Sequence, residues 1–426
     1  MRRALVGVLP AVAAAALALV PLIAPVLVHD EHPPVLRNGA GWRTTWAPAP
    51  SSLGSRLVEP PADAAWLAFG TVPAPPGARG RVVAQALLDL HALTRPNGAV
   101  AAGPDGPWAY AWPRDSAFVA AAYAVTGHQD DALQVLGFLG RVQRSDGGFE
   151  ARYLLDGSGP PDDRPRQSDG AGWVLWSLDR LRAAQPDGVL PRQVQGLRDR
   201  SVAFVMAQTG AGTRLPEVSP DYWEVPERRV TLGTAAPLAA GLEAAARMYA
   251  AERDDRRAAE VARAARRLRA LIRSQFGPDY QRHGGTGGLD AGVTMLMPPF
   301  ALVDDSAAER AWERYPVLAL RTAGGLAPGV DWRQDGVSWT PETALVAYTA
   351  AASGQAPLAE RWMAWLERHC TSWGSLPEKV LPDGSPAGPA PLAWTAALAV
   401  LTEGELATHR SDVVGWVPSA APASVG

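Results

Sequence analysis

The sequence predicts an all-α protein whose helices close into an (α/α)6 barrel, a toroid of six helical hairpins, preceded by an N-terminal membrane or signal segment. Apolar residues recur at helical spacing in block after block from about residue 79, and loops bearing Gly, Pro and Asp separate the blocks. No convincing strand alternation lies between them, and no fixed-period repeat of an open solenoid is visible. A closed ring would bury its inner helices and gather the long loops at one end.

The helix starts carry boundary signals, since Asp115-Ser116 and Thr340-Pro341-Glu342 place caps or acidic first turns there. The expected helices cover residues 80–94, 115–126, 129–143, 168–184, 192–208, 232–251, 254–274, 290–301, 306–320, 340–353, 356–370 and 390–406.

Composition divides the 426 residues into four segments, and the 47% hydrophobic content is ample for one large core. A signal peptide or signal anchor is followed by a Pro/Ala/Gly-rich lead-in or linker, the catalytic barrel and a C-terminal tail. These segments are residues 1–30, 31–78, 79–408 and 409–426. Three tryptophans of the lead-in are expected to pack on the barrel: Trp42, Trp46 and Trp66.

The first residues predict export. Arg2 and Arg3 precede an apolar run at residues 4–28 that is long enough to cross a bilayer as a helix. The two arginines would stay in the cytoplasm and place the rest outside. The sequence leaves open whether the segment is a cleaved signal or a retained anchor. We therefore expect an extracytoplasmic protein that is either membrane-anchored by residues 4–28 or secreted.

Charge and cysteine content exclude several classes. The net charge of −3 favours neither nucleic acid nor an anionic membrane surface as a partner. Cys370 is the single cysteine, so an internal disulfide and a thiolate metal cluster are both excluded. No HExxH motif is present and the histidines do not cluster. Hydrolysis with neither a metal nor another cofactor is the simplest chemistry.

Two carboxylates in aromatic loops carry most of the functional information. Glu224 ends the run Asp-Tyr-Trp-Glu, and Glu378 ends the run Gly-Ser-Leu-Pro-Glu. Indoles suit the apolar faces of a sugar, and two acids on opposite sides of a glycosidic bond are what its hydrolysis requires. We interpret the chain as an inverting glycoside hydrolase, with Glu224 as general acid and Glu378 as general base.

Each assignment has an alternative. Tyr222, Trp223 and the like charge of Asp221 would raise the pKa of Glu224, but Glu224 could equally be a surface residue of a charged loop. Lys379 would keep Glu378 ionised if their side chains face each other, but Glu378 could equally be a solvated loop carboxylate.

Further polar residues predict sugar contacts. Arg114 and Asp115 would offer a donor and an acceptor to adjacent hydroxyls, with Trp112 packing beneath the ring, while Asp115 could instead be a helix N-cap. Asp169 opens another helix and is a weaker candidate for substrate binding. Trp173 and Trp176 follow at helical spacing and indicate core more than stacking platforms.

Taken together, the motifs resemble glycoside hydrolase family 15, the glucoamylase family, over roughly residues 80–408. They occur in the family's order and at similar spacing: Trp112–Asp115, Gln167–Gly170, Asp221–Glu224, Leu289–Ala291 and Leu376–Glu378, the last followed by Pro391–Trp394.

The resemblance implies an (α/α)6 domain that removes glucose from the non-reducing ends of oligosaccharides or other α-glucosides, with inversion. It implies that Glu224 is the general acid and Glu378 the general base. It also implies that Arg114 and Asp115 grip the terminal sugar and that Trp223 forms part of the pocket wall.

The chain departs from the family pattern near these motifs. Val225 stands where a second acid commonly follows the general acid, and Lys379 replaces a Gln after the base. Leu326–Gly329 replaces a region that often holds an Arg-Tyr pair. These departures motivate an alternative, a catalytically silent carbohydrate-binding or regulatory protein on the same scaffold.

Overall fold

The inner layer of the barrel is a closed ring of helices. The computed structural model describes residues 36–37, 43–44, 61–301 and 305–414. Each inner element contacts the next along the chain, and the last returns to the first. The elements are α3 (Pro113–Val125), α5 (Asp169–Ala183), α7 (Leu232–Ala251), the 3-10 helix η2 (Ala291–Leu296), α10 (Thr340–Ala352) and α12 (Ala393–Val414).

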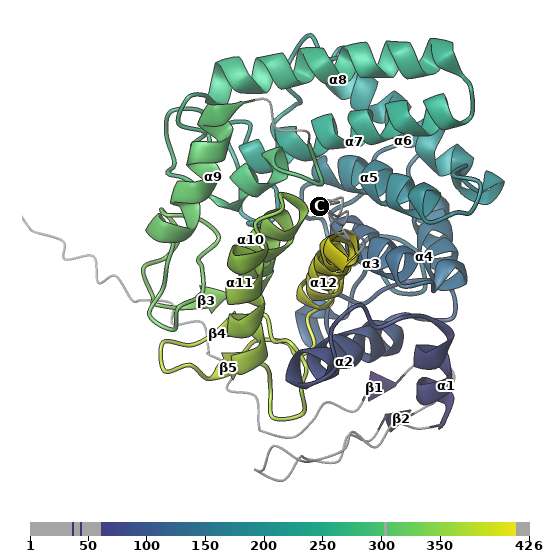
Figure 1. Ribbon diagram of the computed structural model, residues 1–426. Helices are drawn as coiled ribbons and strands as arrows, with labels where there is room; N and C mark the ends of the chain where they lie inside the picture. Colours follow the sequence, from purple (N-terminus) through teal and green to yellow (C-terminus); the bar gives the residue numbers. More distant parts are fainter. Residues whose placement is uncertain (1–35, 38–42, 45–60, 302–304, 415–426) are drawn as a thin grey trace, which may run out of the picture.

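A second layer packs outside this ring. For example, α4 contacts both α3 and α5, α8 contacts α7, and α11 contacts α10. Figure 1 shows α8, α9 and α4 at the periphery, with α3, α10 and α12 nearer the middle. The outer elements are α2 (Ala78–Leu93), α4 (Gln129–Val142), α6 (Arg192–Gln208), α8 (Asp255–Phe276), α9 (Ser306–Leu318) and α11 (Ala356–Arg368).

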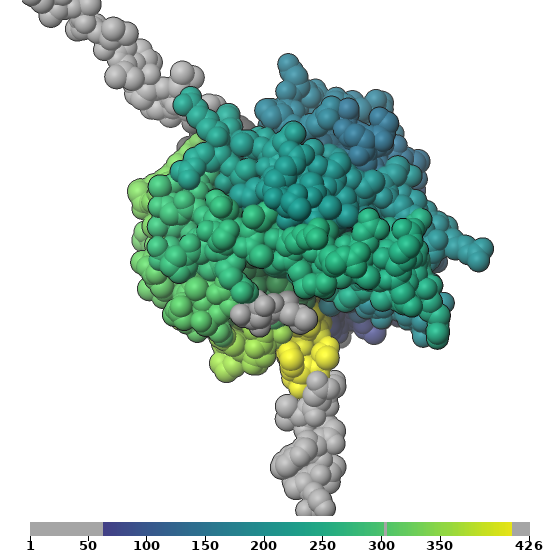
Figure 2. All heavy atoms as spheres, turned by 90° about the horizontal axis from the view of Figure 1, so that it is seen from above, coloured from purple at the N-terminus to yellow at the C-terminus, as the bar shows by residue number. Residues whose placement is uncertain are grey.

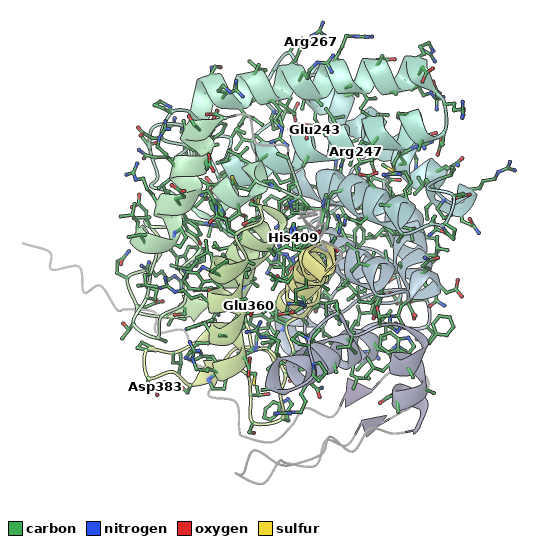
Figure 3. All side chains as sticks on the ribbon, viewed as in Figure 1. Glu243, Arg247, Arg267, Glu360, Asp383 and His409 are labelled. Carbon is green, nitrogen blue, oxygen red and sulfur yellow. The ribbon has the colours of Figure 1, made fainter. Side chains whose placement is uncertain are left out.

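The spacing of apolar residues along a helix decides whether it joins the inner or the outer layer. In α3, every residue except Val125 is buried, so this small-residue helix has neighbours on all sides. In α8, the buried residues recur three or four positions apart, from Val261 to Phe276, and the remaining positions are rich in arginine. Arg267 of α8 points away from the body of the molecule (Figure 3), and Figure 2 shows the face that α8 helps to cover.

The expected helical barrel agrees with this architecture, with one correction. The predicted helix at residues 290–301 is wrong, because this stretch forms only the short η2. Pro298 and Pro299 follow one residue after its end. The residue before a proline is disfavoured in α conformation, and proline has no N–H to continue a helix. The fourth inner position of the ring is therefore the least regular one.

Short strands, which the sequence did not reveal, fix one wall of the site. β3 (Ser338–Trp339), β4 (Lys379–Val380) and β5 (Pro386–Ala387) form an antiparallel sheet in which Trp339 lies opposite Lys379. A second antiparallel pair joins β1 (Leu36–Arg37) and β2 (Arg43–Thr44).

The lead-in contributes a helix, α1 (Pro61–Phe69), that periodicity did not indicate. Trp66 of α1 stacks on His91 and His128, with ring centroids 4.1 and 3.9 Å away, and so packs on the barrel as predicted. Trp42, Trp46, the apolar run at residues 4–28 and the last part of the predicted tail lie outside the described residues. Among the described residues, no helix is both long and apolar enough to span a bilayer.

We predict that Gly172→Ala lowers the free energy of unfolding by about 1–3 kcal/mol, because the added methyl overpacks the contact between α5 and α7. A Cβ at Gly172 would lie 2.3 Å from the carbonyl oxygen of Pro237. Gly137→Ala on α4 is the matched control, since its Cβ meets only Arg141 Nη1 at 3.6 Å. The control should stabilise the helix by about 0.5–1 kcal/mol. Urea unfolding measures both variants, and equal effects would contradict the close packing of the two helices.

Candidate active site

A cavity of about 330 Å³ collects the predicted site residues from loops far apart in sequence. Six of the seven line it: Trp112, Arg114, Asp115, Trp223, Glu224 and Glu378. The seventh, Asp169, does not. Ring closure therefore brings the two predicted catalytic carboxylates to one cavity.

Glu224 occupies a tight, strained turn. Its N–H donates to the carbonyl of Asp221 at 2.9 Å, and the N–H of Trp223 donates to Asp221 Oδ1 at 2.9 Å. The backbone of Glu224 has a φ of 57°, in the left-handed region that a residue with a Cβ rarely adopts. Such strain persists only where the surroundings enforce it, and it is concentrated at functional sites.

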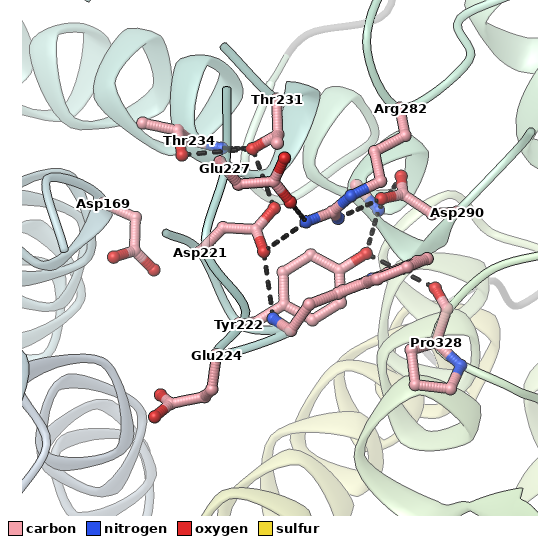
Figure 4. A network of polar contacts seen from close by, with 12 residues as sticks. Asp169, Asp221, Tyr222, Glu224, Glu227, Thr231, Thr234, Arg282, Asp290 and Pro328 are labelled. Carbon is pink, nitrogen blue, oxygen red and sulfur yellow. Dashed lines mark hydrogen bonds and ion pairs between the residues drawn. The ribbon is translucent and has the colours of Figure 1, made fainter. Parts of the chain in front are cut away.

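A buried arginine enforces this turn (Figure 4). Arg282 donates from Nη2 to Asp221 Oδ1 and from Nη1 to Asp290 Oδ2, both at 2.7 Å. It also donates to Glu227 at 2.6 Å, and its guanidinium lies 3.8 Å from the ring centroid of Trp223. One side chain thus holds both the start of the turn and the indole that precedes Glu224.

Asp221 belongs to this network. It is fully buried, and its carboxylate accepts from Arg282 and from Thr231 Oγ1 at 2.7 Å. Figure 4 shows the side chains of Asp221 and Glu224 pointing apart. Asp221 is therefore a structural residue of the turn, and its predicted influence on the charge of Glu224 stays a prediction.

The two oxygens of Glu224 differ. Oε1 accepts from Trp112 Nε1 at 2.9 Å, Gln167 Nε2 at 2.8 Å and Arg114 Nη2 at 3.2 Å. Oε2 accepts from Arg164 Nη1 at 2.6 Å, and the side chain of Arg164 is 38% exposed. Glu224 is thus not a free surface carboxylate. Three donors fix one oxygen, and the other faces a single partner that can move into solvent.

Arg114 is a buried cation of the cavity wall. It donates to Gln167 at 2.9 Å and to Asp169 at 3.2 Å, and its guanidinium lies 5.1 Å from the ring centroid of Trp394. Asp169 also accepts from Trp173 at 3.2 Å and is only 1% exposed. In this structure Asp169 orients Arg114 from behind. Its predicted contact with substrate stays a prediction.

Asp115 is not the helix cap, because α3 begins at Pro113 and Trp112 occupies the N-cap position. Its side chain is buried beside Arg114 and lines the cavity. Burial raises the pKa of Asp115 to about 6, although the Arg114 cation opposes this rise. Trp173 and Trp176 are fully buried core residues, as their spacing indicated.

Glu378 lines the same cavity as Glu224. Trp108 Nε1 donates to its Oε1 at 3.2 Å, and Lys379 Nζ lies 2.9 Å from its Oε2. Burial raises the pKa of Glu378, and the Lys379 cation and Trp108 partly offset the rise. The expected pairing with Lys379 is confirmed. Glu378 is only 8% exposed, so the alternative of a solvated loop carboxylate is wrong.

The backbone around Glu378 is fixed on both sides. Its N–H donates to Pro389 and its carbonyl accepts from Thr340, each at 3.0 Å. Gly388 has a φ of 74°, and a Cβ there would lie 2.7 Å from Glu378 Oε2. A side chain at position 388 would clash with the carboxylate of Glu378, so only glycine fits there.

Sequence reasoning missed several residues of the site. Trp108 lies in a Gly/Pro-rich loop, and Arg164 lies in a charged one, so neither carried a distinctive signal. Glu342 was assigned to a helix start, yet it lines the cavity and is 2% exposed. Arg282 stands seven residues before the Leu289–Ala291 motif, and nothing in the sequence distinguishes it from the other arginines.

Indoles form much of the remaining wall. Trp223, Trp332 and Trp339 line the cavity and meet edge to face, with ring centroids 4.8 and 5.6 Å apart. Apolar ring faces beside charged groups suit a ligand with both C–H faces and hydroxyls. Within the described part of the chain, no three His, Cys, Asp or Glu side chains are grouped to hold a metal ion.

Comparisons with known proteins follow the same lines. No protein-family model matches the chain. Isomaltose glucohydrolase of Kribbella flavida is 27% identical over 304 residues, which are 69% of this chain and 76% of that protein. A wild-type glycosidase structure matches at TM-score 0.67 and 22% identity, covering 77% of this chain and 97% of its own.

Two solved glucoamylases have a similar fold. A bacterial glucoamylase complexed with acarbose gives a TM-score of 0.65 at 18% identity, covering 81% of this chain and 58% of its own. The glucoamylase of Saccharomycopsis fibuligera gives 0.61 at 15% identity, covering 80% of this chain and 97% of its own.

We predict that Arg282→Met lowers the free energy of unfolding by about 3–5 kcal/mol, because it leaves buried carboxylates without their cation. Arg229→Met is the control. Arg229 is exposed and, among the described residues, donates to Thr286 and to the carbonyl of His283, so its loss should change stability little. Chemical denaturation at neutral pH compares the two variants. A loss at Arg282 no larger than that at Arg229 would show that the network does not hold the turn.

Proposed function

We propose that this chain releases glucose from the non-reducing ends of α-glucosides with inversion. Its relatives confirm the predicted resemblance to the glucoamylase-type glycosidases of glycoside hydrolase family 15. The observation that carries the proposal is the placement of Glu224 and Glu378 in one indole-lined cavity. The apolar run at residues 4–28 supports export as part of the same proposal.

The two carboxylates would divide the chemistry. Glu378, when ionised, takes a proton from a water molecule, which attacks the anomeric carbon on the face away from the leaving group. Glu224 gives its proton to the glycosidic oxygen as the bond breaks. The sugar leaves with inverted configuration, and each carboxyl group ends in the protonation state opposite to its starting one. Arg114 and Asp115 would hold the hydroxyls of the terminal ring.

Arg164 adds a condition to this mechanism. Among the described residues, Arg164 is the hydrogen-bond partner of Glu224 Oε2, at 2.6 Å. The general acid must carry a proton when the bond breaks. Because Oε1 is already fixed by three donors, Oε2 would be the oxygen that faces the leaving group, after Arg164 has moved aside.

Short α-1,6-linked glucosides are the first substrates to test. The curated relative is an isomaltose glucohydrolase by name. The cavity volume is near the lower end of the range of about 300–1,000 Å³ for ligand pockets, which suits one or two sugar rings better than a long chain. Starch-derived oligosaccharides and trehalose are the alternatives.

A binding protein without turnover is the second candidate. The Arg164–Glu224 contact favours it, because Arg164 occupies the carboxyl oxygen that would have to meet the glycosidic oxygen. Binding of maltose and isomaltose in calorimetry, with no turnover across a panel of α-glucosides, would select this candidate over hydrolysis.

We predict that the purified protein releases β-glucose first, as observed by NMR during hydrolysis of isomaltose. Glu378→Gln and Glu224→Gln should each lower kcat by about 100- to 10,000-fold, because each removes a proton-transfer group. Glu260→Gln is the control, since Glu260 lies on the outer helix α8, is exposed and does not line the cavity. Release of α-glucose would exclude inversion, and unchanged activity of Glu378→Gln would remove that residue from the mechanism.

We also predict that Lys379→Met moves the acidic limb of the kcat/KM pH profile upward by about 1 unit. A general base works only when ionised, so activity falls as the pH drops through the pKa of Glu378. Burial has raised that pKa and Lys379 opposes the rise, so removing the cation lets the pKa rise further. Lys379→Arg keeps a cation and should leave the limb in place. An unshifted limb in the Met variant would argue against Glu378 as the base.

A further inference from the structure

A third glutamate lies inside the cavity without a role in the proposed hydrolysis. Glu342 lies in the first turn of α10, lines the cavity and is 2% exposed. Its Oε2 has no hydrogen-bond partner among the described residues. A buried polar atom without a partner is unfavourable, and natural proteins keep few of them. The unpaired oxygen therefore indicates that a ligand forms a hydrogen bond with it.

The backbone fixes Glu342 beside the predicted base. Thr340, two residues earlier, donates from its N–H to the carbonyl of Glu378 at 3.0 Å. Trp339 pairs with Lys379 in the β3–β4 ladder. These backbone contacts fix where α10 begins relative to Glu378, so Glu342 and Glu378 extend from one connected wall of the cavity.

The protonation of Glu342 defines what it can bind. Burial raises its pKa to about 8 and the nearby Glu378 adds to the rise, while its own backbone N–H, Arg114 and Lys379 oppose it. At neutral pH the side chain is therefore a carboxylic acid with one donor and further acceptor capacity. A sugar hydroxyl, which both donates and accepts, matches that group.

We propose that Glu342 is a sugar-binding residue of the innermost subsite, where its neutral carboxyl group hydrogen-bonds a hydroxyl of the terminal pyranose next to Glu378. This inference rests on the proposed function and deepens it. A site with a buried group awaiting a hydroxyl rejects analogues that lack it, because the group then stays unpaired. Glu342 would thus help to select the sugar, while Glu224 and Glu378 carry out the reaction.

Calorimetry with glucose tests the proposal, because product binding requires no turnover. Glu342→Gln keeps the shape, a donor and an acceptor, and its affinity at pH 7 should stay within about threefold of wild type. Glu342→Leu should weaken glucose binding by about tenfold, the usual effect of losing a hydrogen bond in a buried site. The monodeoxy glucoses each lack one hydroxyl group. Wild type should bind one of them more weakly than it binds glucose, whereas the Leu variant should bind that analogue and glucose equally well.

A pH series separates binding from a merely structural role. The charged and titratable groups facing Glu342 are Glu378, Lys379, Arg114 and Tyr315. Because the Gln variant retains all four, any difference from wild type reports Glu342 alone. Wild-type affinity for glucose should fall as the pH rises through about 8, where the carboxyl group of Glu342 loses its proton, and the Gln variant should not share this fall.

The outcomes distinguish failure of the proposed function from failure of the proposed role of Glu342. If wild type binds neither glucose nor any α-glucoside, the proposed function fails. If wild type binds glucose while the Leu variant binds it equally well, or if the pH profiles of wild type and Gln variant coincide, the role of Glu342 alone is refuted. Should the Leu variant fail to fold, the pH comparison with the Gln variant decides.

Discussion

The buried contact between Arg282 and its carboxylates is the constraint from which the site follows. Asp221, Asp290 and Arg282 are almost fully buried, and each would be strongly unfavourable alone. Together they tie the turn before α7 to the loop before η2, and the guanidinium packs against Trp223. The left-handed backbone of Glu224 is held by this contact, so the position of one predicted catalytic group depends on charges that never reach the cavity.

The two predicted catalytic carboxylates have different surroundings. Glu224 accepts hydrogen bonds from two arginines, an amide and an indole. Burial raises the pKa of Glu378, and Lys379 and Trp108 offset this rise only in part. In the proposed reaction, Arg164 would have to leave Glu224 Oε2 before that oxygen could meet the leaving group.

Much of the fold could be predicted because helical period is a local property. The buried positions of α8 and the small residues of α3 mark outer and inner helices directly in the sequence. The predicted helix at residues 290–301 failed because Pro298 and Pro299 interrupt an apolar run. The strands β3 to β5 are two residues long, too short for alternation to be recognised. Clusters of aromatic and charged residues likewise led to the prediction that Glu224, Glu378 and Arg114 share one site, and all three line the same cavity.

The sequence by itself predicted the helical ring and six of the side chains that share one cavity, among them Glu224 and Glu378. Tertiary structure alone decided which partners each group received. Asp221 faced Arg282 and not Glu224, Asp169 stood behind Arg114, and Glu342 entered the cavity from a helix start. The physical reason is that the ionisation and hydrogen bonding of a group depend on neighbours within a few ångströms, and in a closed ring those neighbours come from distant parts of the chain.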